Sequence, residues 1–386
     1  MIKLLVDGVF YQFANTGIAR VWKSMLPILA ETDEFEIYFL DRGNAPKIPK
    51  IKYIPFPTHR AADGPADSKL IQEVCDHYKI DIFTSTYYTT PLQTPMVLMI
   101  YDMIPELFNF DLKQRMWMEK DTAINYALRY MCISENTRSD LLKLYPGIPA
   151  KKVSRAYCGV DIEQFQQRGH EEIRAFRKNL GLSKPYFLFV GSRVQHLGYK
   201  NSGLFFKALR QFKRSKFDVL CVGGEKEIDP ELKTIMPRGM QCSRVELTDE
   251  ELSLAYGGAL ALVYPSLYEG FGMPVIEAMA CGCAVITTAK GSLKEAAGDA
   301  ALFISGKDVE EMGCALQQIQ NLDFRNDLKR RGLEHVQQFR WRNFAKEFAE
   351  SIKLCVSDKN SGNYKNFFSE WSRLRLIQAE VNYDKQ

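Results

Sequence analysis

Short apolar runs alternate with amphipathic stretches along the chain, and the alternation occurs as two successive series. The apolar runs of the first series are KLLVDGVF, FEIYFL, KYIPF, IDIFTS, PMVLMIYD, YMCIS and KVSRAY. Those of the second series are YFLFVG, DVLCVGG, ALALVYPS, AVITT and ALFIS. Strands that alternate with helices are typical of a parallel sheet covered by helices, so the pattern predicts an α/β protein with two such sheets.

A polar stretch separates the two series. The segment QQRGHEEIRAFRKNLGLSKP follows the first series and leads into one helix before the second begins. We therefore expect a first domain over residues 1–168, a second over residues 169–344 and C-terminal helices over residues 345–386. Ligand sites of open parallel sheets lie beyond the carboxyl ends of the strands, so two facing sheets would enclose a cleft.

Composition narrows the class of protein. The 51 basic and 47 acidic residues give a net charge of +4, which is too balanced to predict a nucleic-acid partner. Neither the nine cysteines nor the five histidines have the spacing of a metal site, so we expect no metal. The sequence shows no signal peptide and no apolar run near the ~20 residues of a membrane helix, so we expect a cytoplasmic protein. Peripheral contact with the inner face of the membrane stays open.

Glycines and cations at the ends of predicted strands indicate an anion site. The chain lacks GxGxxG and GxxxxGK[ST], which disfavours nicotinamide, flavin and P-loop sites. In VGSRVQHLGYKN, Arg193 leaves a strand end and Lys200 stands just before a helix. Both cations can therefore converge on one anion. The planar guanidinium of Arg193 and the ammonium on the flexible side chain of Lys200 together suit a diphosphate. Two solvated surface cations are the alternative.

The stretch YEGFGMPVIEAMACGCAVITT holds two acids in an apolar run. Pro274 suits a first helical turn and Gly282 a helix end, so Glu269 belongs to a strand-to-helix loop and Glu277 to a short helix. Carboxylates placed in this way accept hydrogen bonds, and hydroxyls of a sugar or a ribose need such acceptors. Alternatively, Glu277 braces a helix and Glu269 a turn. The backbone N–H groups beside them belong to Phe271, Gly272 and Met273.

Together these motifs resemble the retaining glycosyltransferases of GT-B architecture, most closely glycosyltransferase family 4 (glycosyl transferases group 1). EGFGMPVIE followed by AMACGCAVI resembles the acidic motif of that family, and VGSRVQHLGYKN its diphosphate-binding segment. TGIAR resembles its first glycine loop, and ISENTRSDLLKLYPGIPAKKVSRAYCGVDIEQF and GSLKEAAGDAALFI resemble later segments. The resemblance implies two facing, doubly wound Rossmann-like domains with an interdomain cleft, and C-terminal helices that cross back to the first domain.

The resemblance also implies residue roles. Arg193 and Lys200 would bind the donor diphosphate and stabilise its charge as it departs, so both would be catalytic. Glu269 would contact the 3- or 4-hydroxyl of the donor sugar, and Glu277 the ribose hydroxyls. The nucleobase would lie near a loop that includes Arg244. The other donor-binding residues would be Gly17, Val245, Gly270, Phe271, Gly272 and Met273.

This sequence departs from the family's pattern on the acceptor side. Many members have His-Asp after an N-terminal strand, whereas this chain reads Ile100-Tyr101-Asp102. Tyr101 would then replace the histidine beside the transferred sugar, and Asp102 would remain as a hydrogen-bond acceptor. Cys158 stands where the family usually has asparagine, which bears only on a hinge contact.

The expected function is retaining transfer of a hexose from a nucleotide diphosphate sugar to a saccharide or lipid-linked saccharide in polysaccharide biosynthesis. UDP-glucose is favoured as the donor and GDP-mannose comes second. The chain has no DxD pair, so we expect metal independence and no cofactor. A catalytically silent nucleotide-sugar binding module, a phosphorylase-like enzyme and a nicotinamide oxidoreductase are the alternatives. The oligomeric state is open.

Overall fold

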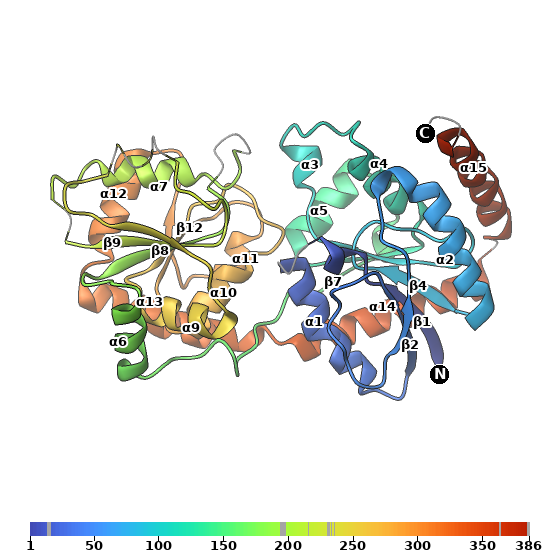
Figure 1. Cartoon of the computed structure of the whole chain (residues 1–386), viewed down its shortest axis with the longest axis horizontal. Coiled ribbons are helices and arrows are strands. Elements are labelled where there is room, and N and C mark those ends of the chain that lie inside the picture. The colour runs from blue at the N-terminus through green and yellow to red at the C-terminus, as the bar shows by residue number, and fades with distance from the viewer. Residues whose placement is uncertain are drawn as a thin grey trace. The chain divides into compact units, whose positions relative to one another are not determined.

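The chain folds as two compact units. The computed structural model describes residues 1–13, 17–193, 198–214, 216–229, 232, 234, 236–362 and 364–383. Unit 1 comprises Met1–Cys158 with Trp341–Gln386, and unit 2 comprises Gly159–Arg340 (Figure 1). The units therefore divide at residues 158/159 and 340/341, whereas the sequence analysis expected boundaries near residues 168 and 344.

Unit 1 is built on parallel strands. They are β1 (Ile2–Asp7), β2 (Phe35–Asp41), β3 (Lys52–Pro55), β4 (Ile82–Ser85), β5 (Val97–Ile100), β6 (Arg129–Cys132) and β7 (Val153–Arg155). One sheet has the order β3-β2-β1-β4 and the other β5-β6-β7. A single parallel bridge between Phe83 and Met96 links β4 to the start of β5. β4, β5 and β6 are buried along their whole length, as expected of strands covered on both faces.

Helices from both ends of the chain cover unit 1. The N-terminal set is α1 (Gly17–Ala30), α2 (Gly64–Tyr78), α3 (Ile104–Leu107), α4 (Arg115–Tyr126) and α5 (Glu135–Leu144), with 3₁₀ turns at Val9–Gln12, Ala61–Asp63 and Ala150–Lys152. The C-terminal set is α14 (Trp341–Ser361) and α15 (Lys365–Tyr383). Trp22 of α1 packs edge-on against Phe348 of α14, with 5.7 Å between ring centroids. On α15, Arg375 forms a buried ion pair with Glu119 of α4, so both C-terminal helices pack within unit 1.

Unit 2 contains one six-stranded parallel sheet. Its strands are β8 (Tyr186–Val190), β9 (Asp218–Val222), β10 (Cys242–Val245), β11 (Leu262–Tyr264), β12 (Val285–Thr288) and β13 (Leu302–Ile304). Their order is β10-β9-β8-β11-β12-β13, which is the Rossmann order 3-2-1-4-5-6. In this order the direction of winding reverses between β8 and β11, and in unit 1 it reverses between β1 and β4. The α/β class with two Rossmann-like units is thus confirmed.

The helices of unit 2 lie on both faces of its sheet. They are α6 (His170–Asn179), α7 (Ser202–Leu209), α9 (Asp249–Gly258), α10 (Met273–Ala280), α11 (Leu293–Ala297), α12 (Val309–Gln318) and α13 (Leu322–His335), with a 3₁₀ turn at Val336–Gln338. α7 and α12 cover one face, and α6, α9 and α10 the other (Figure 1). Phenylalanines of β8 and α7, among them Phe187, Phe189, Phe205 and Phe206, fill the core on the first face. This two-sided cover leaves the ends of the strands as the places where loops can bind ligands.

Candidate active site

A largely buried ion pair lies in unit 2 at the point where the strand order reverses. Lys200 comes between β8 and α7, and Glu269 comes after β11. The Lys200 Nζ atom lies 2.8 Å from Oε1 and 3.1 Å from Oε2 of Glu269, and it also donates to the phenol oxygen of Tyr264 at 3.2 Å. The side chains of Lys200 and Glu269 are 17% and 10% exposed. The charges are therefore shielded from bulk water but open to a ligand on one side.

The pair keeps Lys200 charged. Burial alone would lower the pKa of Lys200, but attraction to Glu269 and to the neighbouring phenols outweighs it and raises the pKa above its ordinary value. Burial raises the pKa of the Tyr264 phenol, and the carboxylate of Glu269 raises it further. At neutral pH the site thus holds an ammonium next to a neutral phenol.

Backbone contacts tie the segment that carries Lys200 to the loop after β11. Asn201, with a left-handed φ of 53°, donates from Nδ2 to the carbonyl oxygen of Pro265 at 3.1 Å. The N–H group of Leu267 donates to the carbonyl oxygen of Tyr199 at 2.7 Å. Because the two bonds join residues on either side of Lys200 to the loop that leads to Glu269, they hold the two charged residues close together.

The acidic motif forms the start of α10, as its proline and glycines predict. Gly272 precedes the helix with a φ of 102°, and a Cβ atom there would lie 2.9 Å from the Leu293 side chain, so only glycine fits. Phe271 is buried edge-on against Phe339. Glu277 is 3% exposed and accepts a hydrogen bond from the Tyr256 hydroxyl at 3.2 Å. The backbone groups from Gly270 to Met273 lie between Glu269 and the helix.

Arg193 lies in the interior of unit 2. Its guanidinium, 3% exposed, donates from Nη1 to the carbonyl oxygen of Gly223 at 2.8 Å and from Nη2 to that of Glu225. Its N–H group donates to the Glu225 carboxylate at 2.6 Å, while Nε is buried without a partner. Arg193 and Lys200 thus have different partners within unit 2, and their convergence on one anion stays a prediction. Residues 194–197 of this segment lie outside the described ones.

Arg244 and Val245 lie in a strand, which corrects the expectation of a loop. Both belong to β10, because Arg244 pairs in parallel register with Cys221 of β9. The Arg244 Nη2 atom donates to the carbonyl oxygen of Gly224 at 3.2 Å, and the guanidinium pairs with Glu246. The carbonyl oxygen of Val245 accepts from Gly223 at 3.0 Å. A loop for a nucleobase can therefore begin only after Val245.

Three predicted site residues belong to unit 1, namely Gly17, which was expected to bind the donor, and Tyr101 and Asp102, which were expected on the acceptor side. Gly17 is the first residue of α1. The Tyr101 hydroxyl accepts from Trp22 Nε1 at 2.6 Å and donates to the carbonyl oxygen of Thr86 at 2.9 Å, and the residue is 3% exposed. Asp102 is half-buried, and its Oδ1 atom accepts from the N–H group that opens α3 at 2.9 Å. Tyr101 thus holds α1 to the loop after β4.

Motif reading missed a buried charge cluster in unit 1. Arg42 forms paired hydrogen bonds with Asp7, at 2.7 and 2.8 Å, and with Asp67, at 3.1 and 2.8 Å. The side chains of Arg42 and Asp7 are 0% exposed. Asp7 ends β1 and Arg42 directly follows β2, and β1 and β2 pair in parallel. An acid and a base at the ends of neighbouring parallel strands are the signal that could have revealed the cluster.

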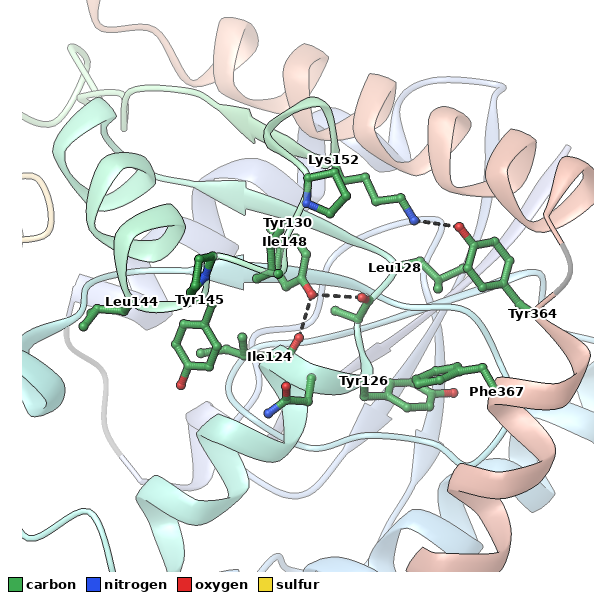
Figure 2. A pocket seen from close by; sticks show the side chains of 15 residues that line it. Ile124, Tyr126, Leu128, Tyr130, Leu144, Tyr145, Ile148, Lys152, Tyr364 and Phe367 are labelled. Carbon is green, nitrogen blue, oxygen red and sulfur yellow. Dashed lines mark hydrogen bonds between the residues drawn. The ribbon is translucent and has the colours of Figure 1, made fainter.

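The opposite edge of unit 1 carries a cavity of about 500 Å³ (Figure 2). It lies before β6, between the ends of α4 and α5 and the start of α15. The Lys152 Nζ atom donates to the Tyr364 hydroxyl at 2.6 Å, and the Tyr130 hydroxyl donates to the carbonyl oxygen of Ile124 at 2.6 Å (Figure 2). These polar groups are satisfied by one another, at the strand edge where parallel sheets do not usually bind ligands.

Metal-binding clusters and membrane-spanning helices are both absent from the part of the chain that the structure describes. Among the described residues, no three or more His, Cys, Asp and Glu side chains gather as a metal site would require. Within those residues no helix combines the length and apolar character needed to cross a bilayer.

Each of the two units matches a known protein family. The family described as Glycosyltransferase Family 4 matches residues 16–164, and the one described as Glycosyl transferases group 1 matches residues 184–321. O-antigen chain mannosyltransferase B of Escherichia coli is 26% identical over 62% of this chain, and the match spans 64% of that protein's own length. Sucrose-phosphate synthase from Thermosynechococcus elongatus aligns with a TM-score of 0.73 at 18% identity, over 92% of this chain and 100% of that one.

Anabaena HepE, solved in complex with UDP-glucose, aligns with a TM-score of 0.69 at 15% identity, over 94% of this chain and 100% of that one. At these identities the two structural likenesses establish the fold. The two family matches show that the chain belongs to glycosyltransferase family 4, the group 1 glycosyl transferases, and the structural likenesses show that it has the GT-B fold.

Proposed function

We propose that the protein is a retaining glycosyltransferase that moves a hexose from a nucleotide diphosphate sugar to a saccharide or lipid-linked saccharide in polysaccharide biosynthesis. The pair formed by Lys200 and Glu269 carries this proposal. It stands where the strand order of a Rossmann-like sheet reverses, which is where such sheets bind nucleotides. Membership of the family supports the reaction class, and the O-antigen relative supports a saccharide product.

The charges of the site suit the departure of a diphosphate. When the bond between the anomeric carbon and the phosphate oxygen breaks, its electron pair stays on the diphosphate, and the ammonium of Lys200 stabilises that charge. The acceptor oxygen bonds to the anomeric carbon from the same face, and its proton passes to a phosphate oxygen of the donor. The carboxylate of Glu269 accepts a hydrogen bond from a hydroxyl group of the sugar, and its negative charge keeps Lys200 protonated. No cofactor takes part in these steps.

Arg193 can take part in this reaction if its guanidinium exchanges its present protein partners for the diphosphate. Its guanidinium donates to the carbonyl oxygens of Gly223 and Glu225 and lies 3.9 Å from the Glu225 carboxylate, and its Nε atom has no partner. Hydrogen bonds between two charged groups are stronger than those to carbonyls. We therefore propose that a bound diphosphate draws the guanidinium away from these carbonyls and adds a second cation to the site.

The donor remains a choice between two hexoses. UDP-glucose is our first candidate, supported by the complex of a structural neighbour with that sugar nucleotide. GDP-mannose is the second, and the name of the E. coli relative as a mannosyltransferase favours mannose as the sugar. We also propose that transfer needs no metal ion, because Lys200 and Arg193 supply the positive charge.

The test measures release of nucleoside diphosphate from UDP-, GDP- and ADP-sugars in excess chelator, with and without a panel of saccharide acceptors. We expect release from one donor in the wild-type protein and its loss in Lys200→Met. Lys294→Met is the matched control, because Lys294 pairs with Asp299 on the surface of the same unit with 50% and 92% exposure. It should keep full activity.

The other outcomes are equally informative. Donor binding, measured by calorimetry, without release in any acceptor mixture would favour a catalytically silent binding module. Absence of binding to every donor would overturn the assignment of the site. Activity that chelator abolishes and a divalent ion restores would overturn metal independence, and a product with inverted anomeric configuration would overturn retention.

A further inference from the structure

A small cavity opens in unit 1 at the carboxyl-terminal edge of its sheet. Its volume is about 120 Å³, and residues that follow β1 and β4 line it together with α4. These two strands are the ones between which the strand order of unit 1 reverses. We propose that this cavity binds one sugar ring of the acceptor, an inference that rests on the proposed function. The lining residues that carry it are Phe13, His59, Tyr87, Tyr88, Thr89 and Met116.

Aromatic rings form the walls. Tyr87 lies against Tyr88 with 4.0 Å between ring centroids, and Phe13 lies 6.3 Å from Tyr87. Phe13 also meets His59 edge-on at 6.4 Å. Flat amphipathic rings with a few fixed polar groups are typical of small-molecule sites. The C–H face of a pyranose packs on such walls and leaves its hydroxyl groups at the edges for hydrogen bonds.

His59 is the fixed polar group of the cavity. Its N–H group donates to Gln12 Oε1 at 2.8 Å, and Gln12 Nε2 donates back to its carbonyl oxygen at 2.5 Å. Its Nδ1 atom lies 2.8 Å from the carboxylate of Asp67, so the proton of a neutral ring belongs on Nδ1. The side chain is 9% exposed, and no described residue hydrogen-bonds to Nε2. Nε2 is therefore an oriented acceptor for a ligand hydroxyl.

The charge cluster behind the cavity holds these groups in place. Arg42 fixes Asp67, which holds His59, and it fixes Asp7, which accepts from the Thr89 hydroxyl at 2.6 Å. Arg42 itself is shut away from solvent. A single rigid cluster thus orients polar groups on both sides of the cavity.

The same arrangement excludes an anionic ligand. No lysine or arginine is among the described residues that line the cavity. Its one carboxylate, Glu119, is already paired with Arg375 in a buried contact and lies 3.3 Å from Arg115. A neutral ligand rich in hydroxyls fits these partners, whereas a phosphate would meet no cation among the lining residues, and Arg115 behind them is held by Glu119 and the carbonyl oxygen of Ala61. The small volume admits one ring and leaves the rest of a longer saccharide outside.

The test uses the full chain without any donor. Ligand-observed saturation-transfer NMR is recorded with the methyl α-glycosides of glucose, mannose and galactose, and with octyl glucoside to distinguish a ring from an alkyl chain. In His59→Asn the side-chain amide takes the place of Nδ1 beside Asp67 but Nε2 is lost. Met116→Trp fills the cavity from a residue that is already 38% exposed, so this variant does not disturb the core.

The matched controls are His77→Asn, on the exposed side of α2, and Met118→Trp, 43% exposed on α4 and outside the cavity lining. We expect ring protons of at least one glycoside to receive saturation in the wild-type protein and both controls. Both cavity variants should weaken this binding at least about fivefold. Binding of no glycoside, equal loss in the controls, or saturation of only the octyl chain would each overturn the proposal.

Failure of this inference is distinguishable from failure of the proposed function. Donor binding, measured by calorimetry on the same variants, reports on the site of Lys200 and Glu269 in unit 2 and should be unchanged in all four. Where transfer is measurable, the cavity variants should raise KM for the acceptor and keep donor hydrolysis in its absence. A protein that binds glycosides in this cavity but no sugar nucleotide would contradict the proposed reaction and leave the cavity assignment intact.

Discussion

The pair of Lys200 and Glu269 allows a structural role of the lysine to be separated from a chemical one. The experiment compares Lys200→Met, Glu269→Gln and the double variant with the wild-type protein. If Lys200 only neutralises Glu269, removal of both charges should restore stability and bring the rate back to that of Glu269→Gln. If Lys200 acts on the departing diphosphate, the double variant should recover stability but stay as slow as Lys200→Met. We expect the second result.

The magnitudes follow from the geometry. At 2.8 Å the charges attract by roughly 6 kcal/mol with an effective dielectric constant of about 20, before the cost of desolvation is subtracted. Removal of one partner from a buried pair costs about 3–5 kcal/mol, and the residual exposure of 17% and 10% places each single variant near the lower limit. The double variant should cost clearly less than the two singles together, with a coupling of at least about 2 kcal/mol. Loss of the cation should slow transfer by about 10²–10³-fold.

The assay has two readouts. Hydrogen exchange of peptides from β8 and β11 reports the local stability of unit 2, and peptides from β1 serve as an internal reference in unit 1. Nucleoside diphosphate release with saturating donor gives the rate. Additive stability losses would refute the proposed coupling, and recovery of the rate in the double variant would refute a role of Lys200 in leaving-group stabilisation.

Two further variants test the sites from other directions. Arg42→Met leaves two buried carboxylates without their cation, so unit 1 should lose about 3–5 kcal/mol near neutral pH. Burial alone raises the pKa of Asp67, but His59 and Arg42 lower it from its ordinary 3.8. The stability that this depressed pKa confers is therefore complete above pH 3.8 and lost as the pH falls through the folded-state pKa, which hydrogen exchange at several pH values would record. Gly272→Ala should cost about 1–3 kcal/mol and reduce diphosphate release, because its φ is 102° and its Cβ would meet α11, whereas Gly181→Ala, at φ 68° in open space, should leave release unchanged.

Most of the fold was predictable because most strands of the sheets are short apolar runs, whereas β10, with the sequence CSRV, is only partly buried and was expected to be a loop. β9, for instance, is buried at all five positions, which matches the continuous run DVLCV. The bounds of α10 were equally predictable from the sequence, because Pro274 lies in its first turn and Gly282 follows its end. Both signals are local, and local signals survive in the folded chain when packing agrees with them.

The partners of the charged residues were less predictable. Arg193 is bonded to carbonyl oxygens around Glu225, 32 positions away along the chain, because the ends of β8 and β9 lie side by side. Tyr101 stands at the expected strand end, but its hydroxyl meets Trp22 across the core of unit 1. Such pairings depend on which strands become neighbours, so residue type and spacing alone do not determine them.

In both units a cation lies at the edge of the sheet where the strand order reverses, but only the cation of unit 2 is available to a ligand. In unit 2 the cation at the strand reversal, Lys200, has a single carboxylate partner and remains 17% exposed, so an incoming anion can share it. In unit 1 the cation at the corresponding edge, Arg42, is bound by two carboxylates and is 0% exposed. Its charge is therefore used to orient His59 and Thr89 rather than to attract a ligand. This division fits the proposed function, because the proposed donor carries the charge of a diphosphate whereas the proposed acceptor ring offers hydroxyl groups.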